Sequence, residues 1–395
     1  MDAISITNLD VVFGDKLEHA LSLLDQGLAR QEIIDQTGQV VGVDNVSLNI
    51  QEGEICVLMG LSGSGKSSLL RAVNGLNTIS RGSLKIKDGD QAVELANCDD
   101  ATMQHLRTHR VSMVFQKFAL MPWLTVLDNV AFGLEMQGMS KKLRREKARE
   151  QLTMVGLDEW ENKFPHELSG GMQQRVGLAR AFAMDSDILL MDEPFSALDP
   201  LIRAQLQEEL LELQSKLNKT ILFVSHDLDE ALKIGNNIAI MESGKLIQHG
   251  QPEDIILNPA TQYVKDFVAH TNPLNVLKGR SLMQPVDELE SQGKRWQVCS
   301  ESELWVGHEN NVLKLHQQSE LQLIHWEQVT MDIEQLNESM IVAASPDIDM
   351  REAIEIKLRT GNPLLLVEGQ QLIGTLSDNN FYQALLGNYQ QLNAA

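Results

Sequence analysis

Hydrophobic positions along this chain follow two different patterns. Apolar and polar residues alternate over residues 4–13 and again over 43–50, which predicts two strands with one buried face each. Three shorter stretches, 55–59, 188–191 and 221–224, are apolar throughout, as in parallel strands covered on both sides. Helical and apolar segments alternate after residue 66, so the sequence predicts an α/β domain around a largely parallel sheet.

A helical segment is predicted between the first two strands. Over residues 16–37 the side chains of Leu17, Leu21 and Leu24 fall on one helical face, with Gly27 interrupting the segment and Gly38 ending it. The charged run over 141–150 is interpreted as the solvated face of another helix. Apolar runs long enough to cross a bilayer are lacking, and the N-terminus lacks the pattern of a signal peptide, so we expect a soluble protein.

Composition narrows the range of functions. The chain has 395 residues, which predicts two or three domains, and a net charge of −22, which argues against a nucleic-acid binder. The three cysteines, Cys56, Cys98 and Cys299, have neither disulfide nor zinc spacing. We expect them to be buried free thiols in a reducing compartment.

The most specific motif follows the apolar run 55–59. Residues 60–67 read Gly-Leu-Ser-Gly-Ser-Gly-Lys-Ser, which fits the phosphate-binding loop G-x-x-x-x-G-K-[ST] between a strand and a helix. The glycines allow the backbone N–H groups to approach phosphate oxygens, Lys66 would reach the terminal phosphates, and the Ser67 hydroxyl would hold Mg²⁺. A chance match is the alternative, and the strand before the loop favours a nucleoside triphosphate site.

Two further segments support this interpretation. The apolar run 188–191 ends in Asp192 and Glu193, of which the first can hold Mg²⁺ through water and the second can polarise an attacking water. Residues 168–174 contain Ser-Gly-Gly before a helix, which offers a second set of free N–H groups. A flexible turn is the structural alternative, but a second phosphate cradle suggests a site completed by another copy of the chain.

Together these motifs resemble the ATP-binding cassette (ABC) ATPases, the motor subunits of ABC transporters, over residues 1 to about 270. The resemblance implies an ATP and Mg²⁺ site, and it implies a role for each matching residue. ATP contacts are implied for Phe13, Gly60, Leu61, Ser62, Gly63, Ser64, Gly65, Lys66, Ser67 and Ser68, and metal contacts for Ser67, Gln116 and Asp192. Catalytic roles are implied for Glu193, His226, Gln116 and Asp192, signature contacts in trans for Ser169, Gly170, Gly171 and Gln173, and dimer-loop contacts for Ser196 and Asp199.

Some of these assignments have a plain structural alternative. Phe13 is expected to stack on adenine, and a core phenylalanine is the structural alternative. Gln116, at the end of the predicted strand 111–115, is assigned to Mg²⁺ and to the link with a membrane partner by the resemblance alone. Met172 departs from the glutamine usual in the signature, but Ser169 and both glycines remain, so catalysis is expected to survive.

A narrower resemblance points to importers of glycine betaine, proline and choline. That subfamily shares the helical insert 16–38, and residues 118–123, 198–203 and 227–231 are also similar to it, while Trp123 and residues 191–195 favour the choline type. The resemblance implies an ATPase at the cytoplasmic face of the membrane, with a second copy of itself, a transmembrane permease and, indirectly, an extracytoplasmic solute-binding protein as partners. An amino-acid or sugar importer and a soluble ABC protein without a transport role are the alternatives.

The sequence pattern changes near residue 270, at His270-Thr271-Asn272-Pro273. Residues 271–395 are therefore predicted to be a separate regulatory region. Within it, residues 340–386 predict strand, helix, two strands joined by a tight turn, and helix, which is similar to one CBS repeat. In CBS modules that bind adenosine, an aspartate follows a serine or threonine by three positions; here Asn380 follows Ser377. Regulation without bound nucleotide, or a structural module, is favoured over an adenosine sensor. The predicted fold is thus a P-loop α/β domain with a helical signature subdomain and a small α+β C-terminal domain.

Overall fold

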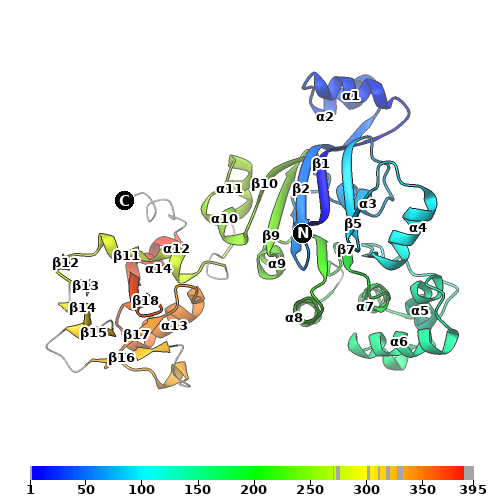
Figure 1. Cartoon of the computed structure of the whole chain (residues 1–395). Coiled ribbons are helices and arrows are strands. Elements are labelled where there is room, and N and C mark those ends of the chain that lie inside the picture. Colours follow the sequence, from blue (N-terminus) through cyan, green and yellow to red (C-terminus); the bar gives the residue numbers. More distant parts are fainter. Residues whose placement is uncertain are drawn as a thin grey trace. The chain divides into compact units, whose positions relative to one another are not determined.

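The computed structural model (Figure 1) describes residues 2–196, 198–269, 271–272, 276–299, 303–309, 312–316, 321–326 and 332–386. The chain forms two compact units, Met1–Ile255 and Ile256–Ala395. The first unit thus ends at residue 255, before the predicted boundary near residue 270. Its last strand ends at Gly250. His270 and Pro273, on which the predicted boundary was based, lie outside the described residues.

An antiparallel sheet with the strand order β2-β1-β4-β5 begins the first unit. Both long strands are confirmed where alternation predicted them, and Ile6 on β1 pairs with Leu48 on β2, both side chains being buried. The bounds are β1 (Asp2–Phe13), β2 (Val40–Gln51), β4 (Arg81–Asp88) and β5 (Gln91–Glu94).

The predicted helical insert consists of two short helices, α1 (Leu17–Asp25) and α2 (Arg30–Thr37), at one end of β1 and β2 (Figure 1). The chain turns between them at Gly27 and leaves α2 at Gly38, both with positive φ, which glycine adopts without a steric penalty. A small core fixes the insert to the sheet; its buried members are Val12, Ala20, Leu23, Ile33 and Val41.

The main sheet of the first unit has six strands in the order β10-β9-β3-β8-β7-β6. Every residue of β3, β7 and β8 is buried, which confirms the parallel strands predicted from the uninterrupted apolar runs. β10 alone pairs antiparallel, with β9. Since β3, β7 and β8 are parallel neighbours, their carboxyl ends meet at one edge of the sheet. The bounds are β3 (Ile55–Met59), β6 (Val111–Val114), β7 (Ile188–Asp192), β8 (Thr220–Val224), β9 (Asn237–Glu242) and β10 (Lys245–Gly250).

Three helices form a subdomain with its own core, in which Val130, Leu152 and Val176 are fully buried. These helices are α5 (Val126–Met136), α6 (Lys141–Met154) and α7 (Gly170–Ala183). The charged part of α6 is largely exposed, as predicted. The other helices of this unit are α3 (Lys66–Val73), α4 (Asp100–His109), α8 (Pro200–Leu217) and α9 (Leu228–Ile234), while α10 (Pro252–Leu257) spans the change of unit. Among the described helices, none combines the length and apolar character of a membrane span.

The second unit contains two sheets, with the strand orders β11-β19-β18-β17-β16 and β12-β13-β14-β15. Over residues 340–386 the order β17, α13, β18, β19, α14 confirms the predicted elements; their relation to a CBS repeat stays a prediction. The bounds are β11 (Gln284–Pro285), β12 (Ser291–Gln292), β13 (Arg295–Cys299), β14 (Leu304–Glu309), β15 (Val312–His316), β16 (Gln322–His325), β17 (Met340–Ala344), β18 (Leu364–Glu368), β19 (Gln371–Leu376), α11 (Gln262–Val268), α12 (Gly279–Leu282), α13 (Met350–Thr360) and α14 (Asp378–Leu385).

The cysteines are free, but only one of them is buried as predicted. Cys56 lies inside β3, whereas Cys98 and Cys299 are partly exposed. The prediction was wrong for these two because Cys98 stands in the loop that leads to the N-cap of α4 and Cys299 is the last residue of β13.

Candidate active site

The loop 60–65 joins the carboxyl end of β3 to the start of α3. Gly60, Gly63 and Gly65 all have positive φ, and a Cβ on Gly60 or Gly65 would collide with a backbone carbonyl, of Met241 and of Gly42 respectively. Glycine is therefore required at these two positions for close backbone packing as well as for conformation. The predicted phosphate cradle has the required strand–loop–helix context.

Lys66 lies within this loop and is largely buried. Its Nζ donates to the carbonyl oxygens of Gly60 at 2.7 Å and Leu61 at 3.0 Å. Burial lowers the pKa of the Lys66 ammonium, and the carboxylates of Glu193 and Asp192 act in the opposite direction. A cation is thus enclosed by the loop, where it can interact with the phosphates of a nucleotide.

Ser67 and Asp192 meet at the same place from two elements. The Ser67 hydroxyl donates to Asp192 Oδ1 at 2.8 Å, and the other carboxylate oxygen pairs with Arg71 Nη2 at 3.1 Å. Asp192 is fully buried at the end of β7. A hydroxyl beside a carboxylate is an all-oxygen donor set of the kind that Mg²⁺ uses together with waters and phosphate oxygens. These residues therefore fit the metal predicted for the site.

Glu193 follows Asp192 and has a left-handed backbone conformation, with φ +49°. Its N–H donates to the carbonyl of Val224, which fixes the turn onto β8. The side-chain Oε2 lies 3.1 Å from His226 Nδ1 and accepts from Gln116 Nε2 at 3.3 Å. The structure thus brings together three of the predicted catalytic side chains. His226 is 33 residues and Gln116 is 77 residues away from Glu193 along the chain.

A buried polar network supports the segment that carries His226. Glu230 accepts from Ser225 Oγ at 2.5 Å and from Gln207 Nε2 at 2.9 Å. Burial raises the pKa of the Glu230 carboxyl, the two hydrogen bonds lower it, and the charge of Asp227 raises it further. Asp227 in turn caps α9 by accepting from the Glu230 N–H. The backbone on both sides of His226 is thereby fixed.

The predicted signature residues begin α7. The Ser169 hydroxyl caps this helix by accepting from the Met172 N–H at 3.3 Å, and Gln173 Nε2 donates to the carbonyl of Leu168. Ser169 and Gly170 are exposed. The start of α7 can therefore present hydroxyl and N–H groups to a second molecule, as the trans role requires.

Phe13 lies at the end of β1 with 40% of its surface exposed, which is unlike a core phenylalanine. A Cβ on Gly42 would meet both the Phe13 ring and the Ser68 hydroxyl, so the ring lies close to the start of α3. This position is compatible with adenine stacking, which stays a prediction. In the predicted dimer loop, the Ser196 hydroxyl donates to the carbonyl of Glu193 and Asp199 caps α8; Ala197 lies outside the described residues.

Sequence reasoning did not identify two arginines that support the site. Arg71 pairs with Asp192, and Arg180 on α7 donates to the carbonyls of Phe118 and Ala119, in the segment after Gln116. Phe118 and Ala119 both have positive φ, which is unusual for residues other than glycine. The two hydrogen bonds from Arg180 therefore stabilise a strained turn. The spacing of Ser67 and Arg71 on one helical face was a usable signal; for Arg180 no local signal existed.

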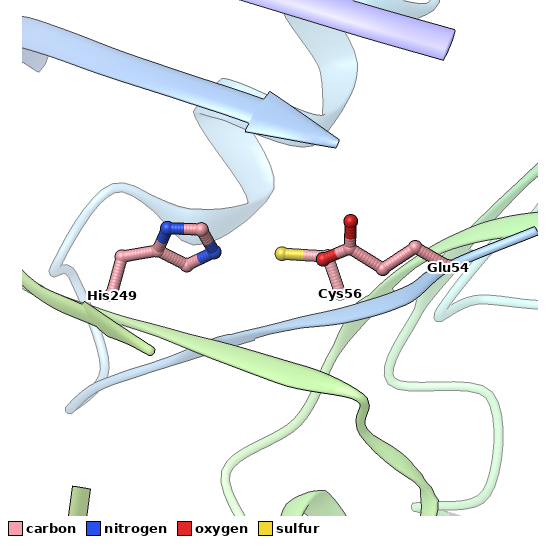
Figure 2. Close-up of side chains that lie close together, drawn as sticks. All are labelled: Glu54, Cys56 and His249. Atoms are coloured by element: carbon pink, nitrogen blue, oxygen red, sulfur yellow. The ribbon is translucent and has the colours of Figure 1, made fainter. Parts of the chain in front are cut away.

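One other group of possible metal ligands occurs among the described residues. Figure 2 shows Glu54, Cys56 and His249, whose ligand atoms lie within 4.8 Å of one another. The Glu54 carboxylate accepts hydrogen bonds from Gln51 N–H and Asn237 Nδ2, and burial raises the pKa of the Cys56 thiol. This trio includes a thiol and an imidazole, which Mg²⁺ does not favour, and Cys56 is near the start of β3, away from the phosphate loop. Ser67 and Asp192 therefore suit Mg²⁺ better than this trio does.

A lysine enclosed by a glycine-rich loop, next to a serine bonded to an aspartate at the end of a neighbouring strand, defines the class of P-loop nucleotide-binding proteins. Comparison with known proteins makes the class more specific. The model of the ABC transporter family matches residues 43–196. A glycine betaine/carnitine transport ATP-binding protein, GbuA of Listeria monocytogenes, is 39% identical over the whole length of both chains. The chain therefore belongs to the ABC transporter family, among its ATP-binding proteins.

Other relatives match over the first part of the chain. The glycine betaine/proline betaine transport system ATP-binding protein ProV of Escherichia coli is 52% identical over 67% of this chain and 65% of its own length. The glycine betaine transport ATP-binding protein OpuAA of Bacillus subtilis is 47% identical over 71% of this chain and 66% of its own length. The chain thus covers slightly less than two thirds of each of these two relatives.

Among solved structures, a dimeric ATP-binding cassette in a post-hydrolysis state, bound to ADP and Pi, is similar. The TM-score is 0.55 at 30% identity, over 63% of this chain and 98% of that chain. Because the match covers nearly all of that cassette, it confirms the ABC ATPase fold for the first unit.

Proposed function

We propose that this chain is the ATP-hydrolysing subunit of a membrane importer for glycine betaine or a related quaternary amine. The observation that carries the proposal is the convergence of Lys66, Asp192 and Glu193 at the carboxyl edge of the main sheet. Phosphate binding, metal binding and activation of water each have a suitable group at that edge.

The chemistry assigned to this chain is hydrolysis of the terminal phosphate of ATP. Mg²⁺, when bound, would neutralise the negative charge that develops on the phosphates during hydrolysis. The loop N–H groups and Lys66 bind the phosphates, and Ser67 with Asp192 hold the metal. Glu193 orients the attacking water and accepts its proton, while His226 holds the Glu193 carboxylate in place.

A second copy of the chain completes the site in this proposal. The exposed N-terminus of α7 offers the Ser169 hydroxyl and free backbone N–H groups, which suit the outer side of a bound triphosphate. The similar solved cassette is described as dimeric, which supports a head-to-tail pair closing on two ATP molecules. Binding would close the pair and hydrolysis would reopen it.

The cargo is inferred from the relatives. The names of the ProV, OpuAA and GbuA proteins include glycine betaine, proline betaine and carnitine, all of which carry a quaternary ammonium group. None of these three names includes choline, which the residues around Trp123 and Pro194 favoured, so we place glycine betaine first. Recognition of such a cation requires an aromatic cage, which a solute-binding protein would supply. A transmembrane permease would connect that protein to this ATPase at the cytoplasmic face of the membrane.

The C-terminal region is proposed to act without a bound adenosine. Asn380, which stands where an adenosine-binding CBS repeat has aspartate, is buried. Its Oδ1 accepts from the Ser377 hydroxyl at 2.6 Å and from the Ser377 N–H at 2.8 Å, and its Nδ2 donates to the carbonyl of Leu282. These contacts cap α14 and connect it to α12, so the amide serves the fold of this unit.

Uptake measurements test the proposed function. Cells that lack this chain are given the wild-type chain or the Glu193→Gln variant, and the uptake of labelled glycine betaine, choline, proline and maltose is followed. Restoration of quaternary-amine uptake by the wild-type chain alone is expected. Restoration of maltose or amino-acid uptake instead would move the chain to another importer class. Unchanged uptake of all four solutes, with ATPase activity intact, would favour a soluble ABC protein without a transport role.

A further inference from the structure

The helical insert contacts the phosphate loop directly. Arg30, the first residue of α2, donates through Nη1 to the carbonyl oxygen of Gly63 at 3.0 Å. We infer that Arg30 is a positioning residue for the phosphate loop, so that the insert is a working part of the nucleotide site. This inference rests on the proposed function, and it assigns a task to a segment that the reaction chemistry does not otherwise use.

The contact fixes one peptide plane of the loop. The Gly63 carbonyl and the Ser64 N–H belong to the same planar unit and point in opposite directions. The Ser64 N–H donates to the carbonyl of Leu61 at 3.1 Å, so the peptide is held on one side by the loop and on the other by Arg30. Glycine restricts its own backbone less than any other residue. Loss of Arg30 would therefore widen the range of loop conformations that nucleotide binding has to restrict.

Arg30 also brings positive charge to this part of the loop. Its guanidinium is partly buried, and its Nε is buried without a hydrogen-bond partner in the described part of the chain. Burial lowers the pKa of Arg30 and the carboxylate of Asp44 raises it, but an arginine stays charged under all working conditions. A cation beside the loop favours the arrival of phosphate groups.

The insert is held firmly enough to position this side chain. Arg81 on β4 pairs with Asp10 on β1 at 2.6 Å and with Asp25 at the end of α1 at 2.8 Å. At the start of the insert, the Lys16 N–H donates to Gln39 Oε1. At the start of α2, Glu32 accepts from the Ala29 N–H, next to Arg30 itself. Arg30 is therefore placed by an element that is fixed to the sheet at several points.

The test is an equilibrium titration of the full-length chain with a fluorescent ATP analogue in the presence of Mg²⁺, together with steady-state ATP hydrolysis. For Arg30→Ala we expect the Kd and KM to rise about tenfold, the lower range for loss of a hydrogen bond to a charged group, because Arg30 is only partly buried. We expect kcat to stay within about twofold of wild type, since Glu193 and His226 are untouched. Arg30→Lys retains a charge and a donor, and it should recover a large part of the affinity.

Two matched variants separate positioning from general damage to the insert. Gln31→Ala changes the neighbouring residue, whose amide donates to Asp35 of the same helix, and should bind as wild type. Ile33→Ala weakens the buried core of the insert and should lower the Tm more than Arg30→Ala does. A Kd for Arg30→Ala within twofold of wild type would overturn the inference. So would equal losses of Tm and affinity in Arg30→Ala and Ile33→Ala without recovery in Arg30→Lys.

Lys66→Ala distinguishes a failure of this inference from a failure of the proposed function. If Lys66→Ala loses affinity for the analogue while Arg30→Ala does not, only the role of Arg30 is wrong. If Lys66→Ala binds the analogue as tightly as wild type, the nucleotide site itself has been misassigned.

Discussion

Glu193 and His226 form a pair at the carboxyl edge of the main sheet, with Oε2 of the glutamate 3.1 Å from Nδ1 of the histidine. The two residues follow neighbouring parallel strands, β7 and β8, and the Glu193 N–H donates to Val224 at the end of β8. Glu193 therefore depends on the neighbouring strand β8 for its position. The left-handed backbone at Glu193 is the kind of local strain that persists where the surrounding structure enforces it.

Replacement of Glu193 by glutamine should separate binding from hydrolysis. The amide keeps the size of the side chain and can still contact Gln116 and His226, but it cannot accept a proton from water. We expect ATP affinity close to wild type, hydrolysis slower by at least ~100-fold, and a stable dimer in the presence of ATP. Phosphate release and the mass of the complex by light scattering measure these effects. Wild-type turnover in this variant would remove Glu193 from the mechanism.

The parts of the site that could be predicted from the sequence are those with local requirements. The glycines of residues 60–65 are needed by the loop itself, and Asp192 with Glu193 stand out at the end of an apolar strand. Arg30 and Arg180 could not be predicted, because each acts on a segment 33 or about 60 residues away and nothing in its own neighbourhood indicates it. Pairings of this kind are set by the fold rather than by spacing along the chain.

Outside the site too, elements with a local sequence pattern could be predicted and elements without one could not. The insert 16–37 was correctly predicted to be helical from its leucine spacing, and Gly27 marked its division into two helices. The structure changes from one compact unit to the other at residues 255–256, before the composition shift near residue 270 on which the predicted domain bounds rest. Those domain bounds stay a prediction. In the second unit, element order could be predicted over 340–386, but a short antiparallel sheet such as β12–β15 has weak periodicity and no motif.

Stability should depend on pH through Glu230. Burial raises the pKa of this carboxyl above its ordinary value of 4.5, so the folded state holds the proton more tightly than the unfolded chain does. Its contribution is most favourable below that ordinary value and is lost as the pH rises through the folded-state pKa. The Tm of wild type relative to Glu230→Gln should therefore fall as the pH rises above 4.5. A difference in Tm that does not change as the pH rises would contradict the shift.

The two partners of Arg81 should contribute unequally to stability. Asp10 is buried and also accepts from the Asn45 N–H at 2.7 Å, whereas Asp25 is exposed. Asp10→Ala leaves that N–H and part of the Arg81 guanidinium unpaired, which should cost about 1–3 kcal/mol, while Asp25→Ala should cost under about 1 kcal/mol. Thermal unfolding of the full-length variants compares them. Equal losses of stability in the two variants would show that the buried partner, Asp10, contributes no more than the exposed one.

Lys66→Ala and Ser169→Arg should fail in different ways if two chains build each site. Lys66→Ala removes a cation from inside the loop, so ATP affinity should fall at least tenfold even in a single chain. Ser169→Arg places a long side chain on the exposed start of α7, so a single chain should bind ATP normally while dimer-dependent hydrolysis is lost. Ser140→Arg is the matched control, because Ser140 is also exposed and precedes a helix, α6, that is not part of the site. An equimolar mixture of the two inactive variants adds a decisive measurement, since a head-to-tail pair would contain one site with neither change and should recover part of the hydrolysis. If both variants show the same binding defect and the mixture stays inactive, the site is formed within one chain.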